Sequence, residues 1–169
     1  MSPKRIQLTL FLNEQESESI EKIRREFNPI QYELIKAHVT LCREDELEQL
    51  EKVMKNLTGL DHGHVAIDFG AVARFSEGKG VFIPAIGEKK PFQNLRAHIL
   101  QGVIDTPRIQ EPHITLMHPR NATCTDEIFE QIKQCNFPNK MVFQKISLIE
   151  QTNGMRWNIL EQFDLKHTI

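Results

Sequence analysis

The chain has 169 residues, of which 40% are hydrophobic and 26% are charged, and its formal net charge is −2 at pH 7. This length and apolar content suit one globular domain, and the near-neutral charge excludes a protein that coats long duplex nucleic acid, which needs a large basic surplus. The only early apolar stretch, Ile6 to Leu12, is short and alternating. It predicts neither a signal peptide nor a membrane span, and it favours a cytoplasmic location.

The first half of the chain predicts alternating strands and helices. Residues 5–12 alternate in hydrophobicity, as a strand with one buried face does. Asn13 is placed to cap the helix that follows, and Pro29 is expected to end it. The remaining elements expected before residue 77 are a strand that begins at His38, a helix over 44–57 and a long strand over 65–75.

From Gly78 the same order of elements begins again. The pattern predicts a strand over 80–86, where Pro84 suggests an edge or a bulge, and a helix over 91–103. A strand that begins at His113 and a helix opened by Thr125 follow. Two final strands are expected over 141–150 and 156–163, joined by a turn over 152–154.

Both halves thus share one order of elements, which predicts a duplicated fold of the α+β class. We expect a single domain over residues 1–169, built from pseudo-repeats of approximately 1–76 and 77–169. Each repeat would form an antiparallel sheet flanked by helices. The two lobes would then surround a central cleft with pseudo-two-fold symmetry.

One tetrapeptide pattern occurs in both halves. It reads His38-Val39-Thr40-Leu41 in the first half and His113-Ile114-Thr115-Leu116 in the second. On a strand, the His and Thr of each copy lie on one face and the two apolar residues lie on the other. Two copies that face each other would place two imidazoles and two hydroxyls around one cleft.

Such a pair of histidines suits phosphoryl transfer without a metal ion. Because histidine has an unperturbed pKa of about 6.5, one ring can accept a proton from the attacking oxygen while the other donates one to the leaving oxygen. Threonine hydroxyls can donate hydrogen bonds to the phosphoryl oxygens. We therefore expect His38 and His113 to be catalytic and Thr40 and Thr115 to bind phosphate, with either ring as the base.

Four further residues are candidates for substrate binding. Arg43 and Arg120 follow the two motifs at similar distances and could neutralise phosphate charge, although strand-end arginines are as often solvated. His118 lies five residues after His113 and has either a structural or a substrate-binding role. Phe75 could stack on a base or belong to the core.

Other chemistries find less support in the sequence. A zinc site would need further ligands beside the two histidines, and no spacing typical of zinc proteins occurs. The chain lacks a P-loop, a GxGxxG motif and a nucleophile elbow, so no cofactor is expected. Three cysteines without a Cys-x-x-Cys pair favour reduced thiols over a disulfide framework.

Two His-[Val/Ile]-Thr-Leu motifs in a chain of this size resemble the two-histidine (2H) phosphoesterases, which include bacterial 2′-5′ RNA ligase-like proteins and cyclic nucleotide phosphodiesterases. The resemblance implies a bilobal, metal-independent enzyme in which His38, Thr40, His113 and Thr115 form the site. It also implies a small nucleotide or an RNA end as substrate. The expected function is hydrolysis of 2′,3′-cyclic phosphates. The alternatives are ATP-independent 2′-5′ RNA ligation, 2′-5′ phosphodiester hydrolysis and non-catalytic binding of nucleotides or RNA ends.

Overall fold

Strands and helices alternate along the chain in the computed structural model, which describes residues 3–167. The strands are β1 (Lys4–Phe11), β2 (His38–Cys42), β3 (Val65–Phe69), β4 (Ala73–Arg74), β5 (Val81–Ile86), β6 (His113–Met117), β7 (Lys140–Phe143), β8 (Lys145–Thr152) and β9 (Asn158–Asp164). The helices are α1 (Glu14–Phe27), α2 (Pro29–Leu34), the 3₁₀-helix η1 (Glu44–Glu46), α3 (Leu50–Thr58), α4 (Lys90–Ile99) and α5 (Asp126–Lys133). None of the helices in this part of the chain has the length and apolarity to cross a membrane.

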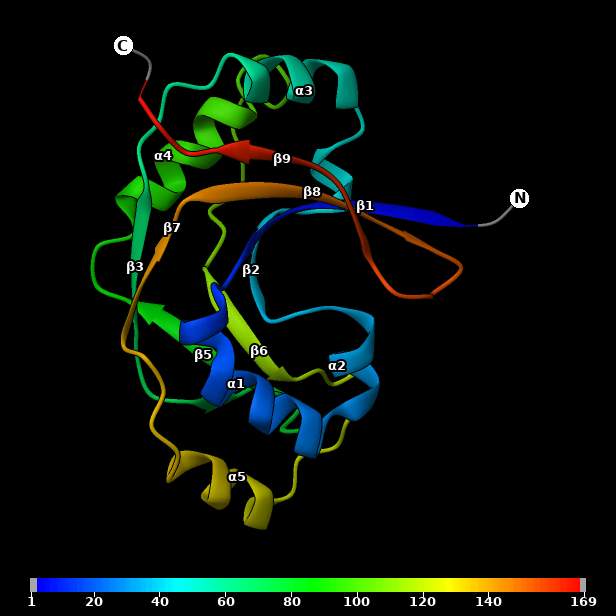
Figure 1. The fold of residues 1–169 in the computed structure, drawn as a ribbon, viewed down its shortest axis with the longest axis vertical. Coiled ribbons are helices and arrows are strands. Elements are labelled where there is room, and N and C mark those ends of the chain that lie inside the picture. The colour runs from blue at the N-terminus through cyan, green and yellow to red at the C-terminus, as the bar shows by residue number, and fades with distance from the viewer. Residues whose placement is uncertain (1–2, 168–169) are drawn as a thin grey trace.

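The strands follow one path in the order β7-β3-β5-β6-β2-β1-β8-β9, with β4 paired to β5, and the paired strands are antiparallel. The path divides at its centre, where β2 pairs with β6, into one lobe of β2, β1, β8 and β9 and another of β6, β5, β3 and β7 (Figure 1). This arrangement confirms the predicted α+β fold with antiparallel sheets and flanking helices.

The two halves of the chain are interlocked. The lobe that contains β1 and β2 takes its next strand, β8, from the second half of the chain. The lobe that contains β5 and β6 takes its next strand, β3, from the first half. Each lobe is therefore completed by a strand from the opposite half, while the repeat boundary near residue 76 stays a prediction.

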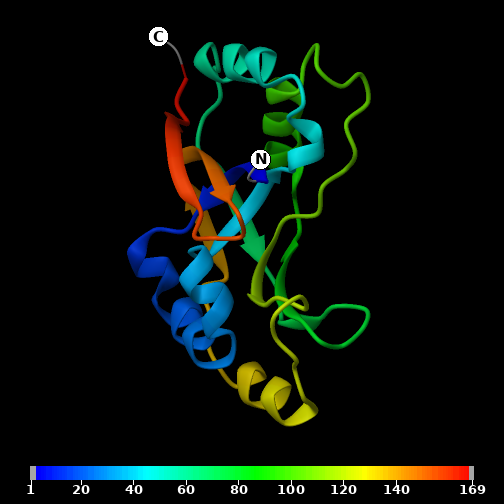
Figure 2. The same cartoon turned by 90° about the vertical axis from the view of Figure 1, so that its right-hand side faces the viewer.

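The helices gather at two ends of the molecule. Helices α3 and α4 pack together at one end, where α4 also contacts β3 (Figure 1). Helices α1 and α2 pack together nearer the other end, where α1 contacts β6 and α5 forms the far tip (Figure 2). The sheet path lies between these two groups, so the centre of the molecule belongs to β2 and β6.

The two motif strands have the same burial pattern, in which buried and half-buried residues alternate from the histidine onward. Val39, Leu41 and Ile114 are fully buried, and Leu116 is 1% exposed. Burying such a side chain stabilises the fold by about 1.5–3 kcal/mol relative to leaving it exposed. This apolar face fixes the register, so the His and Thr of each motif must lie on the opposite face.

Several expected elements have different boundaries. Helix α2 was not predicted, and Pro29 begins it rather than only ending α1, because proline is well suited to the first turn of a helix. The helix expected over 44–57 is divided into η1 and α3. The helix caps predicted at Asn13 and Thr125 are confirmed, since each side chain accepts a hydrogen bond from the backbone N–H three residues later.

The long strands expected over 65–75 and 141–150 are each two strands, so both predictions were wrong. The first is interrupted at Gly70, where an added Cβ would lie 2.7 Å from Cγ2 of Ile86. The second is interrupted at Gln144, because β7 pairs with β3 whereas β8 pairs with β1. Pro84 does not mark an edge strand, because β5 pairs with both β3 and β6. Its register shift lies between Val81 and Phe82.

A buried ion pair connects α4 to the segments that surround the motif strands. Arg96 and Glu46 have side chains that are each 1% exposed, and Nη2 of Arg96 donates to Oε2 of Glu46 at 2.7 Å. Arg96 also donates to the carbonyls of Leu41, at the end of β2, and of Arg108, in the loop before β6. The guanidinium thus holds together three segments that no local sequence pattern connects.

Replacing Glu46 with Ala should lower the free energy of unfolding by about 3–5 kcal/mol, because it leaves the Arg96 charge buried without its partner. Urea denaturation measures the change. The matched control is Glu130→Ala, which removes an exposed ion pair with Lys133 and should cost less than about 1 kcal/mol. Equal effects of the two substitutions would contradict the role assigned to the buried pair.

This stabilisation should also depend on pH. Burial raises the pKa of Glu46, but hydrogen bonds and charge from Arg96 outweigh it and hold that pKa below its usual range. A lowered folded-state pKa means that the contribution is fully present above the ordinary carboxyl pKa and is lost as the pH falls through the lowered value. Urea denaturation at decreasing pH should therefore show a shrinking difference between the unmodified protein and Glu46→Ala.

Candidate active site

A cavity of about 480 Å³ lies over the face of β2 and β6 that carries the motif residues. His38, Thr40, His113 and Thr115 all line it, so the structure brings the two distant motifs together as predicted. Its volume lies within the range of small-molecule sites. The other lining residues are mostly polar: Arg5, Gln7, Arg24, Gln31, Leu34, Ile35, Arg43, Glu44, Asp45, Gln110, His118, Arg120, Gln151 and Trp157.

Both motif imidazoles are held by the same backbone contact. Nδ1 of His38 lies 2.8 Å from the carbonyl oxygen of Lys36, and Nδ1 of His113 lies 3.0 Å from that of Glu111. A carbonyl oxygen only accepts, so Nδ1 carries the proton in each ring. Nε2 is therefore the nitrogen left to exchange protons with a ligand, and it acts as a base when the ring is neutral.

The protein around His38 favours its neutral form. Desolvation lowers the pKa of His38 to about 4, the hydrogen bond to Lys36 opposes this, and the positive charge of Arg24 lowers the pKa further. His113 and His118 act in the same direction as Arg24. At pH 7 His38 is therefore an uncharged imidazole.

Thr40 has a side-chain partner that orients its hydroxyl. Nε2 of Gln7 donates to Oγ1 of Thr40 at 3.2 Å and to Oγ1 of Thr9 at 2.8 Å. Because the Thr40 oxygen accepts this bond, its own proton stays available for a ligand. Oγ1 of Thr115 makes no hydrogen bond with residues 3–167, so this hydroxyl is also available to the cavity.

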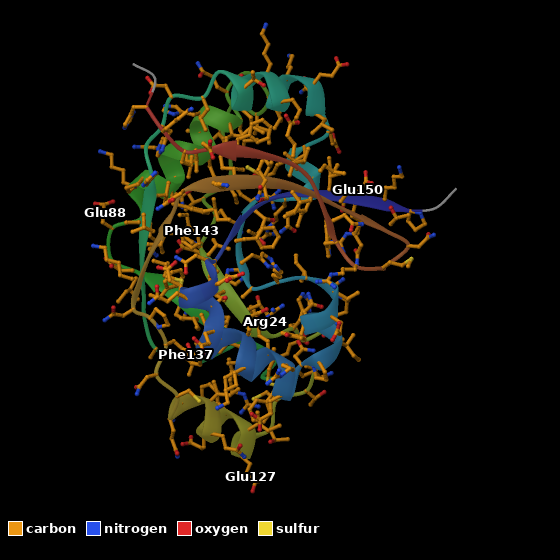
Figure 3. All side chains as sticks on the ribbon, in the orientation of Figure 1. Arg24, Glu88, Glu127, Phe137, Phe143 and Glu150 are labelled. Atoms are coloured by element: carbon orange, nitrogen blue, oxygen red, sulfur yellow. The ribbon has the colours of Figure 1, made fainter. Side chains whose placement is uncertain are left out.

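A buried arginine stands behind His38. Arg24 is 2% exposed, and Figure 3 shows it near the centre of the molecule, whereas Glu88 and Glu127 lie at the periphery. Its Nη2 donates to the carbonyl of Ile35 at 2.6 Å, and its Nη1 pairs with Glu21. Ile35 precedes Lys36, whose carbonyl orients His38, so Arg24 anchors the segment that positions this ring.

His118 and Arg120, two of the residues predicted to bind substrate, both line the cavity and contact each other, and their role in binding stays a prediction. The backbone N–H of Arg120 donates to Nδ1 of His118 at 3.1 Å, and Nη2 of Arg120 lies 3.1 Å from Nε2. Burial lowers the pKa of His118 to about 4, and the charge of Arg120 adds to the effect. His118 is thus uncharged at pH 7 and supports the Arg120 side chain. Arg43 also lines the cavity and is exposed.

Phe75 lies beside a catalytic candidate instead of lining the cavity. Its ring contacts His113 edge-on with centroids 6.0 Å apart, and it packs on Phe82 at 4.5 Å. Phe82 contacts the same imidazole, whereas His38 has the ring of Phe11 as its aromatic neighbour. These contacts show Phe75 as a support for His113, and its stacking on a base stays a prediction.

Neither Cys42 nor a metal-binding cluster within residues 3–167 adds a second reactive group to the cavity. Cys42 is fully buried, and desolvation raises the pKa of its thiol to about 12, which makes it inert as a nucleophile at neutral pH. Within residues 3–167, no group of three or more His, Cys, Asp or Glu side chains is arranged to hold a metal ion.

The sequence interpretation missed several lining residues, among them Arg24, Gln7 and Trp157. Arg24 had a signal, because it lies among Ile20, Ile23 and Phe27 on the apolar side of its helix, where a charge is out of place unless it has buried partners. The same spacing surrounds Arg96 in α4, where the apolar neighbours are Phe92, Leu95 and Ile99. Gln7 and Trp157 had no comparable local signal.

Replacing Arg24 with Met should raise the pKa of His38 from about 4 toward the ordinary histidine value, because a nearby positive charge disfavours the imidazolium. NMR titration of the imidazole C–H signals measures this pKa without any assay of activity. Arg25→Met is the control, since Arg25 is its exposed neighbour on α1. An unchanged His38 pKa in a natively folded Arg24→Met variant would contradict the electrostatic role of Arg24.

Comparison with solved structures shows the same fold in LigT of E. coli, which has been solved in complex with phosphate and with 3′-AMP. The phosphate complex is 16% identical, with a TM-score of 0.67 over 99% of this chain and 100% of LigT. The 3′-AMP complex is 16% identical, with a TM-score of 0.68 over 98% and 99%. TT0787 of Thermus thermophilus is 14% identical, with a TM-score of 0.61 over 98% and 100%.

A search of curated protein sequences gave no significant match. The family model of the 2′-5′ RNA ligase superfamily matches residues 12–155, which include both His-x-Thr motifs and most of the cavity-lining residues. The chain belongs to this superfamily, the 2H phosphoesterases.

Proposed function

We propose that the protein is a metal-independent phosphodiesterase that hydrolyses 2′,3′-cyclic phosphates at RNA ends or in small nucleotides. The observation that carries this proposal is the pair of equivalently held imidazoles in one cavity, each beside its own threonine. The phosphate and 3′-AMP complexes of LigT support a ligand of this kind. A cytoplasmic location is part of the same proposal.

In the proposed reaction, water attacks phosphorus and the bond from phosphorus to one ribose oxygen breaks. His38, which is uncharged at pH 7, takes the proton of the attacking water at Nε2. His113 donates its Nε2 proton to the departing ribose oxygen, so the net change is the addition of one water molecule. Exchange of protons with solvent then returns both imidazoles to their starting protonation states.

The charge developed on the phosphoryl oxygens is balanced by hydrogen bonds and by guanidinium groups. The hydroxyls of Thr40 and Thr115 donate hydrogen bonds to these oxygens. The hydrogen bond from Gln7 orients the Thr40 hydroxyl for this role. Arg43 and Arg120 are the cavity-lining arginines closest in sequence to the two motifs. We assign them to binding of the negatively charged phosphate.

Replacing either His38 or His113 with Ala should lower kcat for a nucleoside 2′,3′-cyclic phosphate by about 10²–10⁴-fold, because each substitution removes one proton transfer. The assay is product release in the presence of EDTA, where the unmodified protein should stay active. His98→Ala is the control, because His98 is exposed and does not line the cavity. Full turnover by both cleft variants would overturn the proposal.

The description of the family favours a second function, the ATP-independent joining of RNA ends through a 2′-5′ linkage. The same acid and base would serve this reaction, in which the 5′-hydroxyl of the second RNA end attacks phosphorus in place of water and one ribose oxygen of the cyclic phosphate leaves. Incubation of RNA that has 2′,3′-cyclic phosphate and 5′-hydroxyl ends, without ATP, should give a joined product under this alternative. Only opened phosphate ends should appear if hydrolysis is the sole activity.

A further inference from the structure

One large aromatic side chain, that of Trp157, lines the mostly polar cavity. Trp157 is the only tryptophan of the chain, it is half-buried, and it lies in the connection between β8 and β9. The other apolar lining residues are Leu34 and Ile35, at the end of α2. The backbone N–H of Trp157 donates to the carbonyl of Leu34 at 2.9 Å, so this connection is joined to the end of α2 beside the cavity.

The connection that carries Trp157 is held in place. Asn153 and Gly154 form its turn with φ values of 55° and 68°. The side chain of Gln151 donates to the carbonyl of Met155 at 2.9 Å, which braces the turn from the inside. Figure 1 shows this connection reaching from the β8–β9 hairpin toward α2. A connection whose backbone is held in this way lowers the entropic cost of binding a ligand against the side chain that it carries.

A guanidinium group accompanies the indole. The Cζ atom of Arg5 lies 5.4 Å from the centre of the Trp157 ring, within the range of a cation–π contact. Arg5 is held in turn by Glu44 at 3.3 Å and by Gln151 at 3.4 Å. Among residues 3–167, no group accepts a hydrogen bond from the indole N–H of Trp157, so this donor is available to a ligand.

Trp157 and the motif residues lie near opposite ends of β1. Arg5 pairs with Gln151 across β1 and β8, whereas Thr9, four residues further along β1, pairs with Thr40. Gln7 lies between them on the same face and reaches Thr40. Arg5 and Trp157 therefore line the same cavity as the motif residues, beyond Gln7 along β1.

The charge of the lining also suits a nucleotide. Four arginines line the cavity, namely Arg5, Arg24, Arg43 and Arg120, against the two carboxylates of Glu44 and Asp45. A polyanionic ligand would be favoured by this surplus, and aromatic side chains and arginine faces are the surfaces on which bases stack.

We propose that Trp157, supported by Arg5, is the nucleobase-binding residue of the site, so that the enzyme acts on base-bearing cyclic phosphates in preference to base-free cyclic phosphodiesters. This inference rests on the proposed function for its substrate, and it adds the residue that selects the substrate class.

Intrinsic fluorescence tests the binding directly, because Trp157 is the sole tryptophan of the chain. Titration with adenosine monophosphate should give a saturable change of tryptophan emission, whereas inorganic phosphate and ribose 5-phosphate should give none. An equal response to all three ligands, or no response to the nucleotide, would overturn the inference.

Kinetics give the second test. The ratio of kcat/KM for a nucleoside 2′,3′-cyclic phosphate to that for a methyl riboside 2′,3′-cyclic phosphate should fall roughly ten-fold or more in Trp157→Leu. Trp157→Phe should restore much of that ratio, since it keeps an aromatic face. Met155→Ala is the matched control, because Met155 is an exposed side chain of the same turn that does not line the cavity.

The two tests separate this inference from the proposed function. If the fluorescence change is specific for the nucleotide but the protein hydrolyses neither substrate, Trp157 binds the base and the proposed phosphodiesterase activity is refuted. If both substrates are turned over and the ratio of their kcat/KM values is the same in the unmodified protein and in Trp157→Leu, the phosphodiesterase activity is supported and base binding by Trp157 is refuted.

Discussion

The site depends on one strand pairing at the centre of the sheet path. Val39 on β2 lies opposite Ile114 on β6, and both side chains are fully buried. This contact joins the two lobes, and it sets the opposite faces of both strands over the same cavity. Without it, two His-x-Thr motifs would be two unrelated surface features. The apolar residues between the catalytic candidates are therefore as important to the site as the polar ones.

Around this centre, each half of the chain places a buried arginine on a helix. Arg24 binds the carbonyl that lies three residues before His38, and Arg96 binds carbonyls in the segments that flank β2 and β6. Both guanidiniums donate hydrogen bonds to backbone carbonyls of segments outside their own helices. Arg24 has a second effect through its charge, since it opposes protonation of His38. Each arginine also has a carboxylate partner, Glu21 for Arg24 and Glu46 for Arg96.

The sequence predicted the parts of the molecule that follow from local periodicity. The motif strands, the amphipathic helix α1 and the capping residues Asn13 and Thr125 are all visible as short-range patterns. The same reasoning failed for strands that change partner, because the break at Gln144 reflects pairing with two different lobes and not a local preference.

The residues of the site also divide into those that a local sequence pattern predicts and those that only the tertiary structure brings to the cavity. The four motif residues could be identified because the pattern occurs twice, and the structure brings all four to one cavity. Gln7 reaches that cavity through the pairing of β1 with β2, and Trp157 through the pairing of β1 with β8, and no short window of sequence contains either pairing. Arg24 and Arg96 were accessible in principle, because both follow one spacing of apolar neighbours along a helix.

The exchange of strands between the halves has a consequence for how the protein is made. Residues 4–11 leave the ribosome well before residues 145–152, with which they pair. Pairing between segments so far apart in sequence slows folding, and the edge of the unpaired strand stays exposed until its partner is available. The nascent chain must therefore be kept from aggregating until residues 145–152 have emerged, and the lobe that contains β1 and β2 is completed only then.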